Sequence, residues 1–125
     1  MVTTPQPCPC GALNSYDACC GTFHSGAPAP TAEKLMRSRY SAFVVLASDY
    51  LLDTWHPDTR PRRLRLDPDD QWTGLTIIST TGGQLFDTEG TVEFTAHQRH
   101  HPPLHEISRF IRVDGRWMYL DGVHR

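Results

Sequence analysis

The 125-residue sequence has no long hydrophobic run and no excess of basic residues. A membrane-spanning helix needs about 20 consecutive apolar residues, so we expect no membrane span. Its 14 acidic and 12 basic residues leave a formal net charge of −2, which argues against a protein that mainly grips nucleic acid. The start, Met1–Gln6, also lacks the positive patch and apolar stretch of a signal peptide. We therefore expect one small cytoplasmic domain with no nucleic-acid partner.

No cysteine follows residue 20, because all four lie close together at Cys8, Cys10, Cys19 and Cys20. A disulfide framework would instead spread its cysteines to link distant segments. Four soft ligands on one short loop match the tetrahedron of thiolates or imidazoles that zinc takes at about 2.0–2.3 Å. Such a closed site predicts a structural Zn²⁺ rather than a catalytic one. His24 is an alternative fourth ligand in place of Cys20, because adjacent ligands strain the geometry.

Two other interpretations of the cysteines stay open. Cys19 and Cys20 could form a strained vicinal disulfide. Buried, metal-free cysteines are disfavoured, since the surrounding segment has almost no apolar residues to bury them.

The composition changes after residue 25. The stretch 25–30 is a Gly/Pro linker, and it separates a zinc-binding segment, 1–25, from a domain that spans 31–125. Thr31 is a good N-cap for an amphipathic helix over 31–46, whose apolar residues recur at three- and four-residue steps. Ser48 is the expected cap of a second helix that reaches Trp55. A charged loop with three prolines then covers 57–70.

The second half of the chain has the alternating pattern of β-strands. Strands are predicted over 72–80, 91–97, 104–113 and 116–120. Asp114-Gly115 predicts a tight hairpin between the last two. Helices followed by antiparallel strands predict an α+β domain with the helices on one face of a sheet.

Two resemblances point to a family. Cys8-Pro9-Cys10-Gly11, Tyr16 and Cys19-Cys20-Gly21 look like the SEC-C motif at the end of the bacterial translocase ATPase SecA, where histidine usually replaces Cys20. Nearly the whole chain is similar to the YchJ-like family of uncharacterised bacterial proteins, through the segments 30–42, 49–52, 54–57, 73–75, 90–94, 104–106 and 115–117. That family joins a SEC-C zinc motif to a nuclear transport factor 2-like (cystatin-like) domain. The resemblance implies a curved sheet that closes on the helices as a cone, with a pocket at its open end.

Polar residues on the strands are the candidates for chemistry in such a pocket. Glu106 shares a strand face with Ser108 and Phe110, and a carboxylate inside an apolar cone could act as an acid or base. Glu106 with His56 is the pair most worth testing. Trp117, Tyr119 and Asp121 are expected to share a face of the last strand. The candidates for the pocket are His56, Trp55, Glu93, Glu106, Tyr40 and Trp117.

A structural role is the alternative for these carboxylates. Glu93 and Glu106 could pair with arginines such as Arg39 or Arg109 and stabilise the sheet.

Two functional hypotheses follow. The first, which the sequence favours, is a binding or adaptor module that contacts a protein partner through its zinc segment, since the SEC-C element of SecA is a contact surface. The second is a small-molecule-binding or enzymatic pocket in the cone. No phosphate-cradling glycine loop and no nucleophile–base arrangement can be read from the sequence, so enzymatic activity stays open. Analogy with the fold also predicts a homodimer formed through the sheet.

Overall fold

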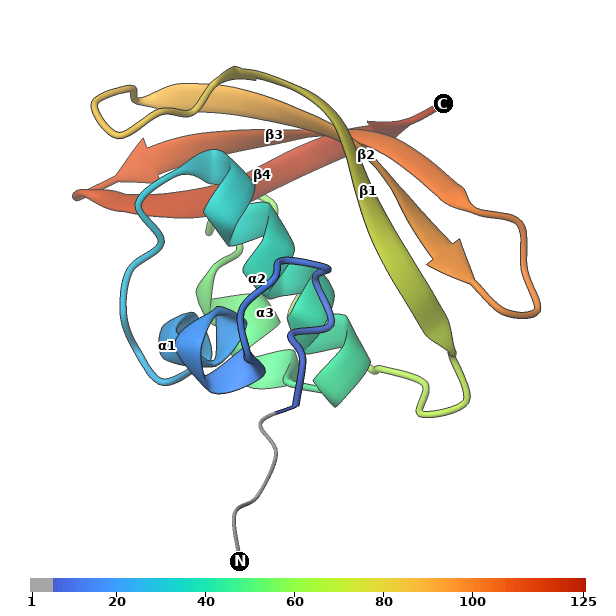
Figure 1. The fold of residues 1–125 in the computed structure, drawn as a ribbon. Coiled ribbons are helices and arrows are strands. Elements are labelled where there is room, and N and C mark those ends of the chain that lie inside the picture. Colours follow the sequence, from blue (N-terminus) through green and yellow to red (C-terminus); the bar gives the residue numbers. More distant parts are fainter. Residues whose placement is uncertain (1–5) are drawn as a thin grey trace, which may run out of the picture.

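The structure, a computed structural model, describes residues 6–125 (Figure 1). The prediction about a signal peptide concerns residues 1–6, and all of these except Gln6 lie outside the described part of the chain. The first five residues of the predicted 1–25 segment lie outside it as well. The helical elements are η1 (Tyr16–Ala18), α1 (Cys20–His24), α2 (Ala32–Val45) and α3 (Ser48–Asp53). The strands are β1 (Trp72–Gly82), β2 (Glu89–Gln98), β3 (Leu104–Val113) and β4 (Arg116–His124).

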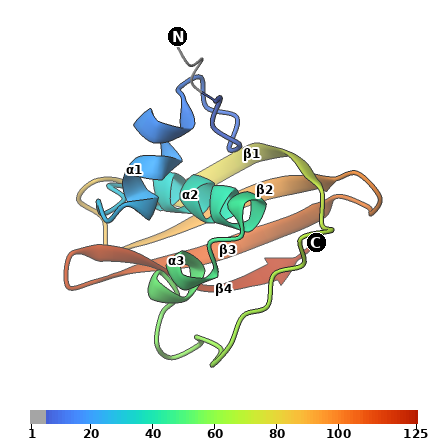
Figure 2. The ribbon, with the colours of Figure 1, turned by 90° about the horizontal axis from the view of Figure 1, so that it is seen from below.

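The four strands form one antiparallel sheet in the order β1-β2-β3-β4. Figure 1 shows that this sheet is strongly curved, and Figure 2 shows α2 lying across its concave face with α3 beside it. The predicted α+β architecture, with the helices on one face of the sheet, is confirmed. No helix within residues 6–125 is long and apolar enough to cross a membrane.

Helix α2 forms the layer opposite the sheet. The hydroxyl of Thr31 accepts a hydrogen bond from the N–H of Lys34 at 3.1 Å, which confirms Thr31 as the N-cap. The buried positions Leu35, Met36 and Tyr40 recur along the helix and give it one apolar side. The next helix differs slightly from the prediction, because Ala47 holds the cap position of α3 and the helix ends at Asp53.

The hairpin between β3 and β4 is the predicted tight turn. Asp114 and Gly115 have φ values of 51° and 80°, the paired positive angles that two-residue hairpins favour.

The same strand pair contains a β-bulge. Arg109 pairs with Asp121, but the next residue, Phe110, pairs with Tyr119, so Leu120 is the extra residue. A bulge breaks the two-residue alternation of side chains. Asp121 therefore lies with Arg109 on the outer face of the sheet, and the prediction that it shares a face with Trp117 and Tyr119 is wrong.

One hydrophobic core fills the space between α2 and the sheet. It contains Leu35, Val92 and Phe110 together with all four cysteines. The Gly/Pro segment also packs against this core, because Ala29 is buried and the Pro30 carbonyl accepts a hydrogen bond from the indole of Trp117 at 3.2 Å. The cysteine segment and the sheet thus share a single core.

Candidate metal centre and cone pocket

The four cysteine sulfur atoms converge at one point beside α2. They come from the turn at Cys8 and Cys10 and from the start of α1 at Cys19 and Cys20. All four sulfurs lie within 4.8 Å of one another, and the four residues are at most 8% exposed. None is in a disulfide, so a vicinal Cys19–Cys20 bond, one of the interpretations left open by the sequence, is absent from the described residues. The cysteine segment has few apolar residues of its own, and the side chains that bury its cysteines belong to the shared hydrophobic core.

The geometry fits a tetrahedral metal ion. Four sulfurs at about 2.3 Å from a central zinc would lie about 3.8 Å apart, and the Sγ atoms of Cys10 and Cys19 are separated by 3.7 Å. No open coordination position would be left, which is the arrangement of a structural site.

The thiols also polarise one another. A hydrogen bond with the Cys20 thiol is the main cause that lowers the pKa of Cys10 to about 4. The Cys20 pKa is raised by that same bond, and burial raises the pKa of Cys19 to about 11. Since the protein favours only one thiolate among these three, binding of a metal ion by all of them would release protons.

Two residues of α2 support the cysteine loop. The Ser41 hydroxyl lies 3.6 Å from Cys8 Sγ, and Arg37 Nη1 donates to the Cys10 carbonyl at 2.9 Å. Hydrogen bonds of this kind hold metal ligands in place.

His24, the alternative ligand, lies outside the sulfur cluster. Its Nδ1 is 2.5 Å from the Tyr16 hydroxyl and its Nε2 is 2.8 Å from the Ser38 carbonyl oxygen. The ring also packs against the Tyr50 ring in a tilted arrangement, with ring centres 4.6 Å apart. Both ring nitrogens therefore have partners, and His24 fastens α1 to α2.

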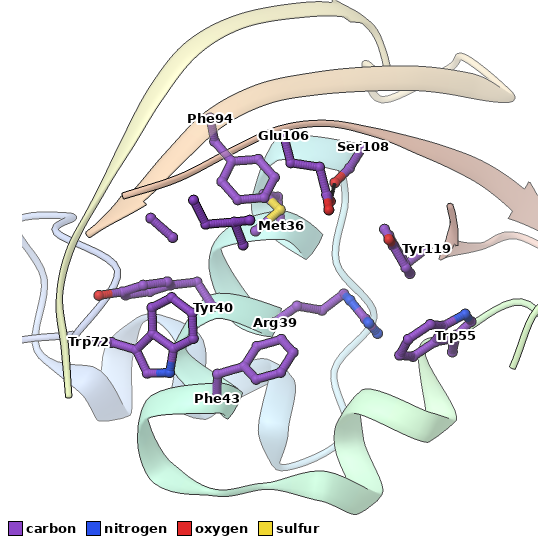
Figure 3. Close-up of a pocket in the computed structure, with 12 residues that line it drawn as sticks. Met36, Arg39, Tyr40, Phe43, Trp55, Trp72, Phe94, Glu106, Ser108 and Tyr119 are labelled. Carbon is purple, nitrogen blue, oxygen red and sulfur yellow. Dashed lines mark hydrogen bonds between the residues drawn. The ribbon is translucent and has the colours of Figure 1, made fainter. Parts of the chain in front are cut away.

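A second site, which we call the cone pocket, lies between α2 and the concave face of the sheet (Figure 3). Its volume is about 180 Å³. Half of its lining residues are aromatic. It is lined by Met36, Arg39, Tyr40, Phe43, Trp55, Trp72, Phe94, Ala96, Leu104, Glu106, Ser108 and Tyr119.

Arg39 brings a positive charge to the wall of the cone pocket. Arg39 is only 4% exposed. Its guanidinium carbon lies 5.1 Å from the centre of the Trp55 ring and 4.5 Å from the centre of the Tyr119 ring. Nη1 donates hydrogen bonds to the Leu51 carbonyl at 2.8 Å and to the Thr54 hydroxyl at 2.7 Å. Burial lowers the pKa of Arg39 to about 10, which leaves the group charged at neutral pH.

Glu106 is the carboxylate of the cone pocket. One oxygen accepts a hydrogen bond from the Ser108 hydroxyl, and the other lies 3.4 Å from Nε2 of His124. Figure 3 shows Glu106 reaching from the sheet towards the space above Arg39. Arg39 forms no ion pair with Glu106 within 4.0 Å. The pairing of these two residues that the sequence offered as a structural alternative is therefore not formed.

The structure brings Tyr40, Trp55 and Glu106 of the predicted candidates together in the cone pocket. The predicted pair of Glu106 with His56 is not brought together in this pocket. Trp55 forms an isolated bridge with Tyr119, and His56, the next residue, lies outside the lining with its Nδ1 accepting the N–H of Asp58. Side chains alternate along an extended segment, which explains why only Trp55 faces inward.

The other two candidates also lie outside the cone pocket. Glu93 is on the outer face of the sheet, where it pairs with His105 at 2.7 Å and accepts a hydrogen bond from Ser79. The expected pairing of Glu93 with an arginine is therefore replaced by one with histidine. Arg109 instead pairs with Asp121. Trp117 is buried under the linker through its bond to Pro30.

Arg39 was expected from the sequence only as a partner for carboxylates and not as a residue of the pocket. One signal could have placed it there, because Arg39 falls within the apolar stripe of α2 between Met36 and Tyr40. Phe43 belongs to the same helical stripe, whereas Trp72 had no such signal, because the strand register that brings it to Phe43 depends on tertiary packing.

Comparison with known proteins shows which family the chain belongs to. A family profile described as the YchJ middle nuclear transport factor 2-like domain matches residues 31–122. The chain belongs to the YchJ-like family. It is 62% identical over 117 residues to a UPF0225 protein of Streptomyces coelicolor, which covers 93% of this chain and 94% of the relative. It is 47% identical to a UPF0225 protein of Deinococcus radiodurans, over 94% of this chain and 89% of the relative.

Two solved structures share the fold of this YchJ-like protein. The solution structure of a SEC-C motif containing protein from Rhodopseudomonas palustris has a TM-score of 0.77 at 32% identity and covers 93% of this chain and 96% of its own. The crystal structure of a SEC-C motif containing protein from Psychrobacter arcticus has a TM-score of 0.78 at 30% identity, over 97% and 84%. The nuclear transport factor 2-like fold is thus confirmed for this chain.

Proposed function

We propose that this YchJ-like protein binds a small molecule in the cone pocket, and that a structural zinc ion on its four cysteines stabilises the wall of that pocket. The observation that carries the proposal is a buried arginine among aromatic rings in a cavity large enough for a ligand. Ligand sites are typically concave, apolar and provided with a few fixed polar groups. Arg39, Glu106 and Ser108 are such groups.

The pocket is tested by filling it. Ala96 lies in the lining and is 3% exposed, so an Ala96→Leu substitution would occupy the cavity. Wild type should be stabilised against thermal unfolding by small aromatic molecules, and Ala96→Leu should lose that stabilisation. The matched control is Thr95→Leu, since Thr95 points to the outer face, opposite His105. Equal ligand responses in wild type and Ala96→Leu would contradict the proposal.

The zinc ion is proposed for Cys8, Cys10, Cys19 and Cys20, because their spacing fits a tetrahedral thiolate site and the two solved relatives carry SEC-C motifs. When bound, the ion would cross-link the cysteine turn to the start of α1. Elemental mass spectrometry should find about one zinc per chain, and chelation should release titratable thiols. A metal-free preparation from zinc-replete cells would contradict this. The four cysteines form no disulfide in the described chain, which also favours the reducing cytoplasm as the location.

Protein contact through the zinc segment is the second candidate function. Leu13 favours it, because this leucine is fully exposed in the loop between Cys10 and Cys19. A rigid loop loses little entropy when a partner binds it. Leu13→Asp should leave zinc content unchanged and abolish capture of a specific bacterial partner that wild type retains. Retention of the same partner by Leu13→Asp would exclude Leu13 as the contact.

A further inference from the structure

We propose that the ligand of the cone pocket is a small monocarboxylate with one aromatic ring, whose carboxylate binds Arg39 and whose ring lies among the aromatic side chains of the wall. This inference deepens the small-molecule function and rests on it.

The size of the cavity sets the size of the ligand. An apolar protein cavity of about 150 Å³ can hold one benzene molecule. The cone pocket, at about 180 Å³, therefore has room for one ring and a small substituent. Tyr40 and Phe43 from α2 face Trp72 of β1 at ring-centre distances of 6.2 and 6.1 Å. Such rings contact a planar ligand through edge-to-face or offset-stacked arrangements.

The charge on Arg39 sets the sign of the ligand. A buried guanidinium is costly unless an anion or hydrogen-bond acceptors compensate it. Only Nη1 has partners among residues 6–125, namely Leu51 and Thr54, while Nε and Nη2 have none. No carboxylate of these residues lies within 4.0 Å of the group.

The orientation of Arg39 is fixed before any ligand binds. The two hydrogen bonds of Nη1 anchor the guanidinium to the end of α3, and the rings of Trp55 and Tyr119 flank it. The Nε and Nη2 donors match the two oxygens of a carboxylate.

Glu106 limits the ligand to a single negative charge. Its oxygens already have Ser108 and His124 as partners, so Glu106 does not compete directly for Arg39. A second carboxylate on the ligand would meet this negative charge inside the cone, whereas a ring hydroxyl could donate to it. Monocarboxylates are therefore favoured over dicarboxylates.

The experiment compares three probes of similar size on the full-length, zinc-loaded protein. Benzoate, benzyl alcohol and benzylamine differ mainly in charge, and calorimetry or the fluorescence of Trp55 and Trp72 reports their binding. We expect benzoate to bind at least about tenfold more tightly than benzyl alcohol, as charge-assisted hydrogen bonds imply. Ala96→Leu should abolish benzoate binding and Thr95→Leu should not. Glu106→Gln should tighten benzoate binding or leave it unchanged.

Each other outcome has a definite meaning. Equal affinity for benzoate and benzyl alcohol, with loss of both in Ala96→Leu, would keep the pocket as a ligand site and overturn its preference for carboxylates. Tighter binding of benzylamine would also overturn the preference for carboxylates, and would show that the negative charge of Glu106 dominates ligand binding in the pocket. Benzoate binding that survives in Ala96→Leu would place the anion outside the cone pocket and overturn the inference. Failure of all three probes at millimolar concentration would overturn this inference, while a response of wild type but not Ala96→Leu to other small molecules would still support the broader function.

Discussion

Substitution of Ser41 by alanine should weaken metal binding without unfolding the protein. Ser41 is fully buried in α2, and its hydroxyl lies 3.6 Å from Cys8 Sγ. When Cys8 is a metal-bound thiolate, this hydroxyl can donate a hydrogen bond to the sulfur. Alanine removes that donor and only one atom of volume, so the fold should tolerate the change.

The expected loss of zinc affinity follows from the position of Ser41, which hydrogen-bonds the proposed metal ligand Cys8 and does not itself bind the metal. Loss of a group that hydrogen-bonds a metal ligand typically costs 10–100-fold in affinity. This corresponds to about 1.4–2.7 kcal/mol of binding free energy. The affinity for Zn²⁺ would be measured by competition with a chromophoric chelator at fixed pH and ionic strength.

Ser79→Ala is the matched control for Ser41→Ala. Ser79 is an exposed serine on the outer face of the sheet, where it donates to Glu93. Ser79→Ala should bind zinc as wild type does. An affinity of Ser41→Ala within about twofold of wild type would refute the idea that α2 tunes the metal centre. Circular dichroism of both metal-free variants would show whether any loss comes instead from unfolding.

Substitutions at three further positions test the frame around the two sites. Gly90→Ala should destabilise the protein by about 1–3 kcal/mol in chemical denaturation, because its Cβ would collide with the Gly83 backbone; an unchanged midpoint would contradict this close approach. Thr31→Ala should cost about 1 kcal/mol through loss of the α2 N-cap, and Thr31→Ser should restore it. The pKa of Asp121 is lowered by Arg109, so this carboxylate stabilises the fold above its unfolded pKa and loses that effect as the pH falls through the lower folded value. Asp121→Asn should therefore show a flatter decline of stability below about pH 4 than wild type.

The order of the elements could be predicted because each has a strong local signal. Thr31 followed by apolar residues in helical spacing marks α2, and Asp114-Gly115 marks the last hairpin. The inner face of β3, with Glu106 and Ser108, follows directly from two-residue alternation. The bulge at Leu120 gives no such signal, and the pattern therefore failed for Asp121.

The composition of the pocket was harder to predict, because it depends on how distant segments meet. His56 and Trp55 are neighbours in sequence, yet only Trp55 turns inward, since its bridge to Tyr119 fixes which way each residue faces. Arg39 was hidden by its residue type, because an arginine within an apolar stripe is easily taken for one that reaches solvent. Its burial is explained by tertiary contacts, because the end of α3 accepts its hydrogen bond and two aromatic rings flank its guanidinium.

Helix α2 connects the two candidate sites, because opposite sides of it serve each one. Arg37 and Ser41, four residues apart and hence on one side of the helix, contact the cysteine loop. Arg39, two residues from each of them and about 160–200° around the helix, lines the cone pocket from the opposite side. A helix is rigid over this length, so the cysteine centre helps to fix where the pocket wall stands.

Removal of the metal should therefore weaken ligand binding even though no cysteine lines the pocket. Chelation of the wild-type protein is expected to lower the affinity for benzoate, and addition of zinc should restore it. The control is Leu13→Asp, which keeps the four cysteines and should respond to chelation as wild type does. If benzoate affinity is the same with and without zinc, α2 is held by the sheet alone, and the metal centre and the pocket act independently.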